Sequence, residues 1–155
     1  MNPECRACTI SGKTREVVVR DAMPTMRSVM TPFPQVVEPT VTAGAARALM
    51  TAQRIHHLPV VAAGGFLGVA TATVLAGVPA SQPVGELALT PAVEVPMSMP
   101  LDRVLDELAA RRLDVAVAFK DERVAGIFTL VDACRRFAVF LRQVYPGGPH
   151  GDSAA

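Results

Sequence analysis

Two copies of one pattern of short motifs run along this chain, and this internal repeat constrains its fold more than any other feature. Residues 29–32 (VMTP) return as residues 88–91 (ALTP), and residues 68–71 (GVAT) return as residues 126–129 (GIFT). The spacing between copies is 59 residues for the first motif and 58 for the second, so one residue has been lost between them. Such a repeat predicts two similar structural units that pack together. Small ligands usually bind in the cleft between such units.

The composition is that of a folded protein with no strong charge bias. Half of the 155 residues are hydrophobic, 19% are charged, and the formal net charge is +1. The chain therefore has enough apolar material for a compact core. Because the arginines are spread along the chain, electrostatics give no reason to expect nucleic acid or an anionic membrane as a partner.

The three cysteines favour a reduced protein. Cys5, Cys8 and Cys134 are odd in number and no secretory signal precedes them, so we expect a cytoplasmic protein without a disulfide scaffold. Cys5 and Cys8 form a CxxC pair, which is a weak metal or redox candidate. Zinc would need two further ligands, and Cys134 and His150 are the only late candidates. The alternative is that the pair belongs to a flexible, reduced N-terminal tail.

An uncharged stretch of 23 residues, 58–80, is long enough in principle to cross a membrane. Its counterpart in the second copy contains residues 120–123 (KDER), which a membrane span would not tolerate cheaply. Because the copies should share a fold, we expect no membrane span. Gly64 and Gly65 lie between two apolar runs and instead predict the turn of a β-hairpin.

Both copies predict the order strand, helix, strand, strand, helix. In the first copy these elements are residues 35–38, a helix capped by Thr42, 58–61, 66–69 and 72–75. In the second they are residues 92–95, 101–112, 115–119, 124–128 and a longer helix from Leu130. The helix of the first copy should direct one apolar face to the core, formed by Ala45, Ala46, Leu49 and Met50. Two residues of this face, Ala46 and Met50, match Val104 and Leu108 in the helix of the second copy.

The last helix is amphipathic. Its apolar side is formed by Ala133, Phe137, Leu141 and Val144, and its basic side largely by Arg135, Arg136 and Arg142. The simpler hypothesis is that the apolar side packs on its own unit. The sharper hypothesis is a dimer contact through Phe137 and Phe140, because small units often complete their burial by pairing. Residues 147–149 (GGP) should end the helix, and we expect the residues after it to be disordered.

Taken in order, the motifs resemble those of the cystathionine-β-synthase-type domain, or CBS domain. In the first copy they are residues 29–32, 46–50, 55–61 (IHHLPVV) and 68–71; in the second they are residues 90–91, 112–115 (RLDV) and 126–129, followed by Asp132. The resemblance covers residues 28–137. It implies a tandem CBS pair, an α/β (α+β) fold in which two pseudo-symmetric β-α-β-β-α units pack through their sheets. The domains would be residues 28–80 and 81–140, with an N-terminal lead-in at 1–27 and a helix end and tail at 141–155.

The resemblance also implies a function. CBS pairs commonly bind adenosine-containing ligands such as AMP, ADP, ATP or S-adenosylmethionine, and they usually act as regulatory sensors, often as homodimers, rather than as enzymes. No cofactor would be required. Since no catalytic, transport or DNA-binding domain is recognisable in the chain, the regulated partner would be a separate protein.

Thr129 and Asp132 are the residues that the resemblance places at the ligand, the Asp on the ribose hydroxyls and the Thr on phosphate. The chemistry is reasonable, because a carboxylate can accept hydrogen bonds from two adjacent hydroxyls, and a helix N-terminus favours phosphate. The alternative is that Thr129 and Asp132 only cap the helix, each contributing about 1 kcal/mol. In the first copy Thr71 is present, but Val74 occupies the Asp position, so we expect one competent site.

The resemblance further implies that adenine lies near Pro91, Ala92, Val115 and Ala116, and it counts Thr90 and Thr71 among the ligand-binding residues. His57 resembles a histidine that faces the cleft between CBS units, so it either touches a ligand phosphate or only packs. His56 and His57 should point to opposite faces of an extended segment and cannot easily share a metal ion. Two functions stay open: an adenosine-ligand sensor, and a structural dimerisation or docking module that binds no ligand.

Overall fold

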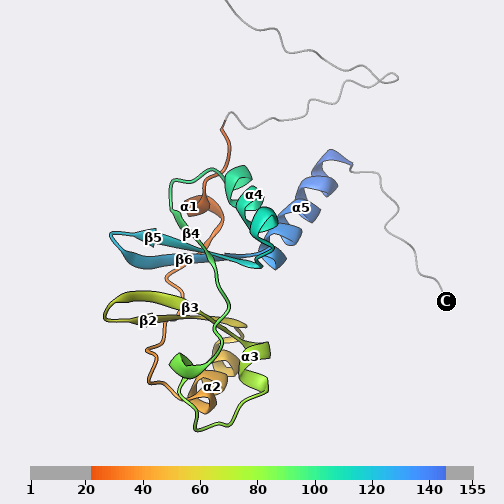
Figure 1. The fold of residues 1–155 in the computed structure, drawn as a ribbon. Coiled ribbons are helices and arrows are strands. Elements are labelled where there is room, and N and C mark those ends of the chain that lie inside the picture. The colour runs from red at the N-terminus through yellow and green to blue at the C-terminus, as the bar shows by residue number, and fades with distance from the viewer. Residues whose placement is uncertain (1–21, 146–155) are drawn as a thin grey trace, which may run out of the picture.

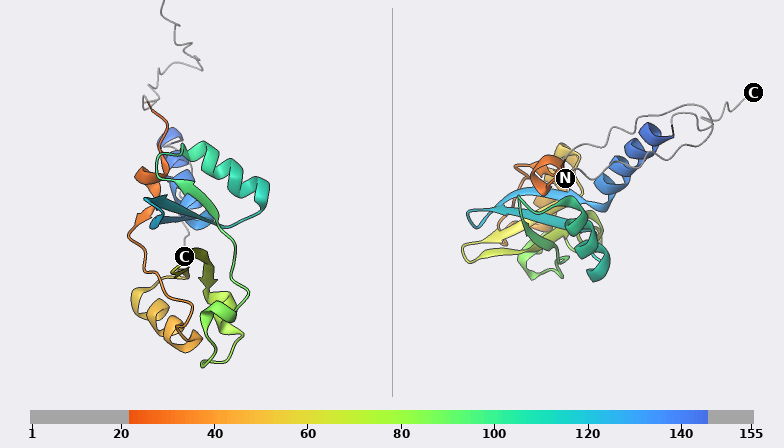
Figure 2. Two further views of the ribbon diagram at one scale, coloured as in Figure 1. Left: turned by 60° about the vertical axis from the view of Figure 1, so that its left-hand side comes forward. Right: turned by 90° about the horizontal axis from the view of Figure 1, so that it is seen from above.

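Four layers make up the protein: helices, a sheet, a second sheet, and helices again (Figures 1 and 2). The computed structural model describes residues 22–145. The first unit contains α2 (Ala43–Gln53), β2 (His57–Ala62), β3 (Gly65–Thr71), α3 (Ala72–Ala76) and the short 3-10 helix η1 (Val84–Glu86). The second contains β4 (Val93–Pro96), α4 (Leu101–Arg111), β5 (Val115–Lys120), β6 (Arg123–Thr129) and α5 (Leu130–Val144). Before both units come α1 (Met26–Val29) and β1 (Thr31–Pro32).

The two hairpins are built alike. Strands β2 and β3 pair antiparallel, as do β5 and β6, and each pair has a bulge at the same place, after Val60 and after Ala118. The uncharged segment 58–80 is therefore a hairpin followed by α3, as the sequence predicts. In the described part of the chain, no helix has the length and apolar character needed to cross a membrane.

The first strand of each copy lies parallel to the hairpin, but the two copies differ in extent. Strand β4 pairs with β5 over four residues, whereas the predicted strand 35–38 is reduced to one bridge between Val37 and Val60. The register places Gln35 where the second copy has Val93, which is buried. Since Gln35 stays exposed, this segment has one inward apolar residue instead of two, and no full strand forms.

The two sheets pack face to face through apolar side chains. Val69, Val115, Val117 and Ile127 form this shared core. At its edge the rings of Phe66 and Phe119 meet edge to face, with centroids 5.7 Å apart. The predicted packing of the two units through their sheets is confirmed.

Each unit is completed by a segment that precedes the other unit. Strand β1 pairs with β6, joining Thr31 to Ile127, and Thr90 forms the matching bridge to Val69. Met30 packs so closely over Gly126 that a Cβ there would lie 2.1 Å from the methionine sulfur. The buried Met26 and Val29 of α1 belong to the core of the second unit. The two halves are therefore interlaced through their lead-in segments.

The cap of α2 is as predicted, but its buried face and the end of α4 differ from the prediction. Thr42 caps α2 as expected, accepting a hydrogen bond from the Ala45 N–H at 3.3 Å. Ala45 itself is exposed, however, because the helix begins at Ala43 and buries positions 43, 46 and 50, one stripe at helical spacing. Helix α4 ends at Arg111, with Arg112 in the left-handed conformation as its C-cap.

Helix α5 leaves the body of the protein after its first turns (Figure 1). Ala133 packs against the core of the second unit, but no residue of α5 is buried, and Phe137, Phe140 and Leu141 are exposed. The prediction that its apolar side packs on its own unit is therefore wrong beyond the first turns. The helix ends at Val144, and residues 147–149 lie outside the described residues.

Candidate functional site

Thr129 and Asp132 form a capping box at the start of α5. The Thr129 Oγ1 accepts a hydrogen bond from the Asp132 N–H at 3.3 Å, and the Thr129 N–H donates to Asp132 Oδ2 at 3.0 Å. The Thr129 hydroxyl also donates to Asp132 Oδ2, at 2.7 Å. The helix-capping role that the sequence left open is thus present, and it occupies one of the two carboxylate oxygens.

The first copy has the same cap without the carboxylate. Thr71 Oγ1 accepts a hydrogen bond from the Val74 N–H at 3.2 Å, in the same arrangement as Thr129 and Asp132. Helix α3 therefore begins like α5, although the aliphatic Val74 can accept no hydrogen bond from a ligand. The two copies share the cap and differ in the group beside it.

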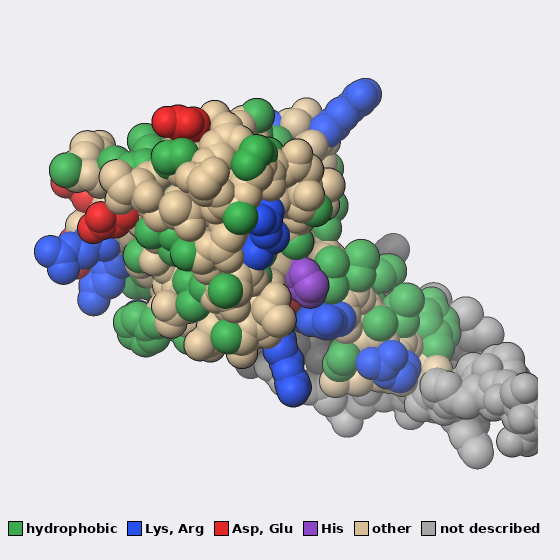
Figure 3. Space-filling view, turned by 90° about the horizontal axis from the view of Figure 1, so that it is seen from below, with side chains coloured by type: hydrophobic (Ala, Val, Ile, Leu, Met, Phe, Trp, Pro, Cys, Tyr) green, Lys and Arg blue, Asp and Glu red, His purple; other side chains and the backbone are tan. Residues whose placement is uncertain are grey.

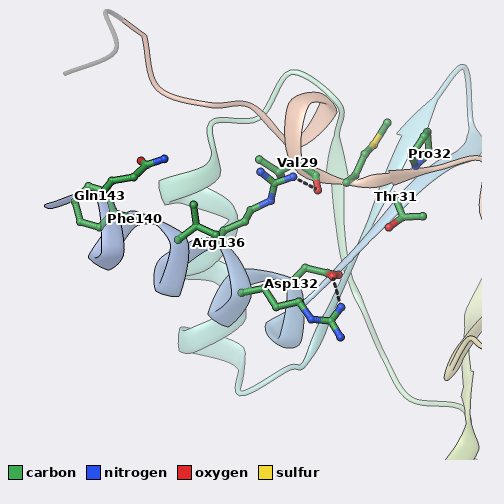
Figure 4. A pocket seen from close by; sticks show the side chains of 10 residues that line it. Val29, Thr31, Pro32, Asp132, Arg136, Phe140 and Gln143 are labelled. Carbon is green, nitrogen blue, oxygen red and sulfur yellow. Dashed lines mark hydrogen bonds and ion pairs between the residues drawn. The ribbon is translucent and has the colours of Figure 1, made fainter. Parts of the chain in front are cut away.

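A cavity of about 570 Å³ lies beside Asp132, between the 29–32 segment and one face of α5 (Figure 4). Its volume falls within the roughly 300–1,000 Å³ typical of small-ligand pockets. Ten residues line it: Val29, Met30, Thr31, Pro32, Asp132, Arg135, Arg136, Val139, Phe140 and Gln143. Because β1 pairs with β6, the lead-in segment of the first copy faces the aspartate of the second.

Two arginines stand beside the aspartate. Arg135 lies 3.8 Å from Asp132 Oδ1, and its side chain is 77% exposed, against 30% for Asp132. Arg136 Nη2 donates to the Val29 carbonyl oxygen at 3.1 Å, which ties α5 to the end of α1 (Figure 4). The sequence reasoning missed Val29, Thr31, Arg135 and Arg136 as cavity residues. The (i, i+3) and (i, i+4) spacing of the arginines from Asp132 was the available signal, since it places all three on one helical face.

The structure brings neither Thr90 nor the predicted adenine residues to this cavity. Thr90 is bridged to Val69 of the first unit, and Pro91 is exposed beside it. Ala92 packs against the shared core between the sheets. Val115 and Ala116 have no exposed surface, so a ligand could reach their side chains only by displacing core residues. The motif 29–32 occupies the place beside Asp132 that the sequence reasoning gave to residues 90–92.

His57 is half-buried on β2, opposite Thr71 of β3. Burial, and to a lesser extent the neighbouring His56, lower its pKa below the ordinary value of 6.5, while the carboxylates of Asp114 and Asp132 act in the opposite direction. The adjacent His56 is exposed, in keeping with alternation along an extended segment. His57 does not line the cavity, although the field of Asp132 reaches it.

The proposed metal ligands fall mostly outside the described residues. Cys5, Cys8 and His150 lie there, and Cys134 is an exposed free thiol on α5. Within residues 22–145 no group of three or more His, Cys, Asp or Glu side chains is arranged to hold a metal ion.

Comparison with known families decides what kind of protein this is. The family model of the CBS domain matches residues 26–78 and again residues 84–139. The chain belongs to the CBS domain family. It contains two CBS domains in tandem, as the repeat predicts, and no curated protein matches it significantly.

Solved structures with the same fold include CBS domains and CBS domain pairs. A putative acetoin utilization protein (AcuB) from Vibrio cholerae superposes with a TM-score of 0.66 at 20% identity, covering 83% of this chain and 100% of the other. The CBS domain pair of protein MJ0100, in complex with 5′-methylthioadenosine and S-adenosyl-L-methionine, gives 0.66 at 19% identity, covering 77% and 99%. The CBS domain of the bacterial CNNM/CorC family Mg²⁺ transporter, in complex with ATP, gives 0.65 at 25% identity, covering 74% and 87%.

Proposed function

We propose that this CBS pair is a non-enzymatic regulatory module that binds an adenosine-containing ligand at Asp132 and passes the binding signal to a separate protein. The observation that carries the proposal is the meeting of Asp132 with the 29–32 segment around one cavity. AMP, ADP, ATP and S-adenosylmethionine are the candidate ligands. The adenosine compounds bound to the MJ0100 and CNNM/CorC domains support this ligand class. A cytoplasmic location and a homodimer are further parts of the proposal.

The chemistry rests on how the Asp132 carboxylate is held. Its Oδ2 takes both hydrogen bonds from Thr129, so the side chain is fixed before a ligand arrives. Among the described residues, the one ion-pair partner of Oδ1 is the exposed Arg135, and Oδ1 can accept a hydrogen bond from a ribose hydroxyl. Because Oδ2 already accepts two hydrogen bonds, the neighbouring ribose hydroxyl would donate to the second lone pair of Oδ1. Thr129 then acts mainly as the residue that orients the carboxylate, and a phosphate would reach its hydroxyl only by replacing the bond to Asp132.

The site also suggests how binding would be transmitted. The cavity is bounded on one side by the chain that leads into the first unit and on the other by α5 of the second. A ligand held between them would favour one arrangement of α5 relative to β1 over others. Because α5 projects from the body with apolar side chains exposed, a change in its position would alter the surface offered to a partner.

Calorimetric titration tests the proposal directly. The native protein should bind at least one of AMP, ADP, ATP and S-adenosylmethionine with one site per chain. Saturation at a hundredfold excess over Kd should raise the free energy of unfolding by roughly 2.7 kcal/mol. Asp132→Asn, which keeps a capping acceptor but removes the charge, should weaken binding by roughly tenfold or more, because it replaces a charge-assisted hydrogen bond.

A control variant tests whether the loss of any carboxylate in the first turn of a helix changes the affinity. Asp102 is an exposed carboxylate in the first turn of α4, and Asp102→Asn should leave the affinity unchanged. If none of the four ligands binds the native protein, the sensor proposal fails. Equal affinities of the native protein and Asp132→Asn would show that the ligand binds at another site.

A second function is favoured by two specific observations. Asp132 already has a structural role in the capping box, and α5 leaves Phe137 and Phe140 exposed, with their rings stacked at 6.2 Å. Both fit a CBS pair that dimerises or docks through α5 and binds no ligand. The titration distinguishes the two functions, because this alternative requires that no adenosine compound bind while association through α5 persists.

A further inference from the structure

The charges around the Asp132 cavity do not cancel. Asp132, Arg135 and Arg136 are the charged residues among the ten that line it, so the wall carries a net charge of +1 at neutral pH. Arg135 forms a long ion pair with the Asp132 carboxylate, with 3.8 Å between Nη1 and Oδ1. Arg136 instead contacts the Val29 carbonyl oxygen, and within residues 22–145 no carboxylate lies at ion-pair distance from it. One positive charge at the cavity is thus left without a counter-charge in the described structure.

The two arginines are held differently, and the difference matters for a ligand. Arg136 is fixed by its bond to the backbone at the end of α1, which uses one of its five N–H donors and leaves others toward the cavity. Arg135 is largely exposed and has only the long contact to Asp132. A flexible side chain of this kind can turn from the carboxylate to an anionic group bound beside it.

The backbone adds to the same field. Helix α5 spans 15 residues, and its N-terminal turn, which carries the positive end of the helix dipole, lies at Asp132. Further along α5, Val139 and Phe140 add apolar lining to the cavity, which the 29–32 segment also bounds. A ligand with a flat apolar part and a negatively charged part matches this distribution, because aromatic side chains stack on bases and arginines pair with phosphates.

From this charge distribution we infer that the site selects adenosine ligands that carry a 5′-phosphate over those that carry a 5′-thioether or sulfonium group, and that Arg135 and Arg136 are the residues that select. The inference rests on the proposed function, since it assigns a ligand class to the same site. With the ribose hydroxyls on Asp132, the two arginines follow the aspartate by three and four residues on the same face of α5. A phosphate there would gain from both guanidinium groups, whereas the positively charged sulfonium of S-adenosylmethionine would be repelled by them.

Two ligands isolate the effect of the phosphate. AMP and 5′-methylthioadenosine share the adenosine part and differ at the 5′ position, where one carries a phosphate and the other an uncharged methylthio group. By calorimetry at low ionic strength, AMP should bind the native protein about tenfold more tightly than 5′-methylthioadenosine does, as expected for added charge-assisted hydrogen bonds. The ratio should shrink when the salt concentration is raised from about 0.05 M to about 0.5 M, because salt screens partly exposed charges.

Variants of the arginines assign the preference to residues. Arg135→Gln should weaken the affinity for AMP roughly three- to tenfold and change the affinity for 5′-methylthioadenosine by less than about twofold. Arg136→Gln also breaks the bond to Val29, so Arg136→Lys, which keeps the positive charge, accompanies it and should retain more of the AMP preference than Arg136→Gln. Arg142→Gln is the control, because this arginine is on the same helix but does not line the cavity.

The outcomes separate this inference from the proposed function. If AMP and 5′-methylthioadenosine bind equally well and Asp132→Asn weakens both, the adenosine site stands and phosphate selection is overturned. A preference for AMP that survives in both Arg135→Gln and Arg136→Gln would overturn the assignment to these residues. If none of AMP, ADP, ATP and S-adenosylmethionine binds the native protein, the proposed function fails and this inference fails with it.

Discussion

At the scale of single residues, comparison of the two copies separates folding from function. Thr71 and Thr129 cap their helices in the same way, so folding by itself accounts for a threonine in both copies. Asp132 is different. Helix α3 forms with Val74 at the matching position, so the fold does not require a carboxylate there. The carboxylate at position 132 is therefore the feature that helix formation explains least, and the one that a ligand would explain best.

His57 gives a prediction about pH. Its pKa is lowered in the folded protein, so below about pH 6.5 the unfolded chain binds more protons than the folded one. The free energy of unfolding should therefore be highest above that pH and fall as the pH drops through it toward the folded pKa, with a slope of at most about 1.4 kcal/mol per pH unit for one proton. Urea denaturation at pH 7.5, 6.5 and 5.5 measures this fall.

The variant His57→Gln should flatten this part of the pH profile, because glutamine does not titrate. An unchanged slope in His57→Gln would show that another group is responsible.

At the scale of elements, α5 differs from every other long helix of the protein. Helices α2 and α4 each bury residues in their unit, whereas α5 buries none along its 15 residues. Figure 3 shows hydrophobic side chains on the part of the molecule that projects beyond the body, with basic side chains among them. An apolar helical surface of this kind usually marks an interaction site. A second copy of the chain would cover it and fits the homodimer proposed above.

A single charge on this surface should separate the dimer. Phe137 is 60% exposed, so Phe137→Glu should leave the fold intact. Sedimentation equilibrium should show the dissociation constant raised by roughly thirtyfold or more, because a buried interface aromatic contributes about 2 kcal/mol or more. Leu67→Glu is the control, as Leu67 is 51% exposed on β3 of the first unit. A native protein that stays monomeric at high micromolar concentration would contradict the dimer.

At the scale of the whole molecule, the repeat does not divide the chain into two independent halves. The lead-in segment of each copy pairs with the last strand of the other copy, so α1 and β1 complete the second unit. The two sheets then bury Val69, Val115 and Val117 between them. The candidate site arises from the same interlacing, because it lies where the first lead-in segment meets α5.

This interlacing predicts that a residue near the N-terminus stabilises the second unit. Met26 is fully buried among residues of the second unit, although it precedes the first. Met26→Ala should lower the free energy of unfolding by about 2–5 kcal/mol, and hydrogen exchange should increase most in α4, β4, β5 and β6. Met23→Ala, at an exposed position three residues earlier, should change stability by less than about 0.5 kcal/mol. Loss of protection confined to the first unit would contradict the interlaced core.

Much of the fold follows from the sequence by itself. The repeat, read with the hydrophobic periodicity of each copy, predicted the number of units, both hairpins and, apart from the strand expected at residues 35–38, the order of elements. The resemblance of the motifs to those of the CBS domain predicted the family. The Thr42 cap and the start of α5 also follow, since a cap depends on residues three or four apart in the chain. The difference between Val74 and Asp132 was visible for the same reason, because it needs only the alignment of one copy on the other.

The tertiary structure decided which parts of the chain meet. The motifs at 29–32 and 88–91 are so alike that nothing in either tells which one faces Asp132, and only the pairing of β1 with β6 places residues 29–32 there. Whether the apolar side of α5 packs on its own unit likewise depends on the direction in which the helix leaves the sheet. Local signals determine local elements, whereas a site shared by segments a hundred residues apart is determined by how those elements pack.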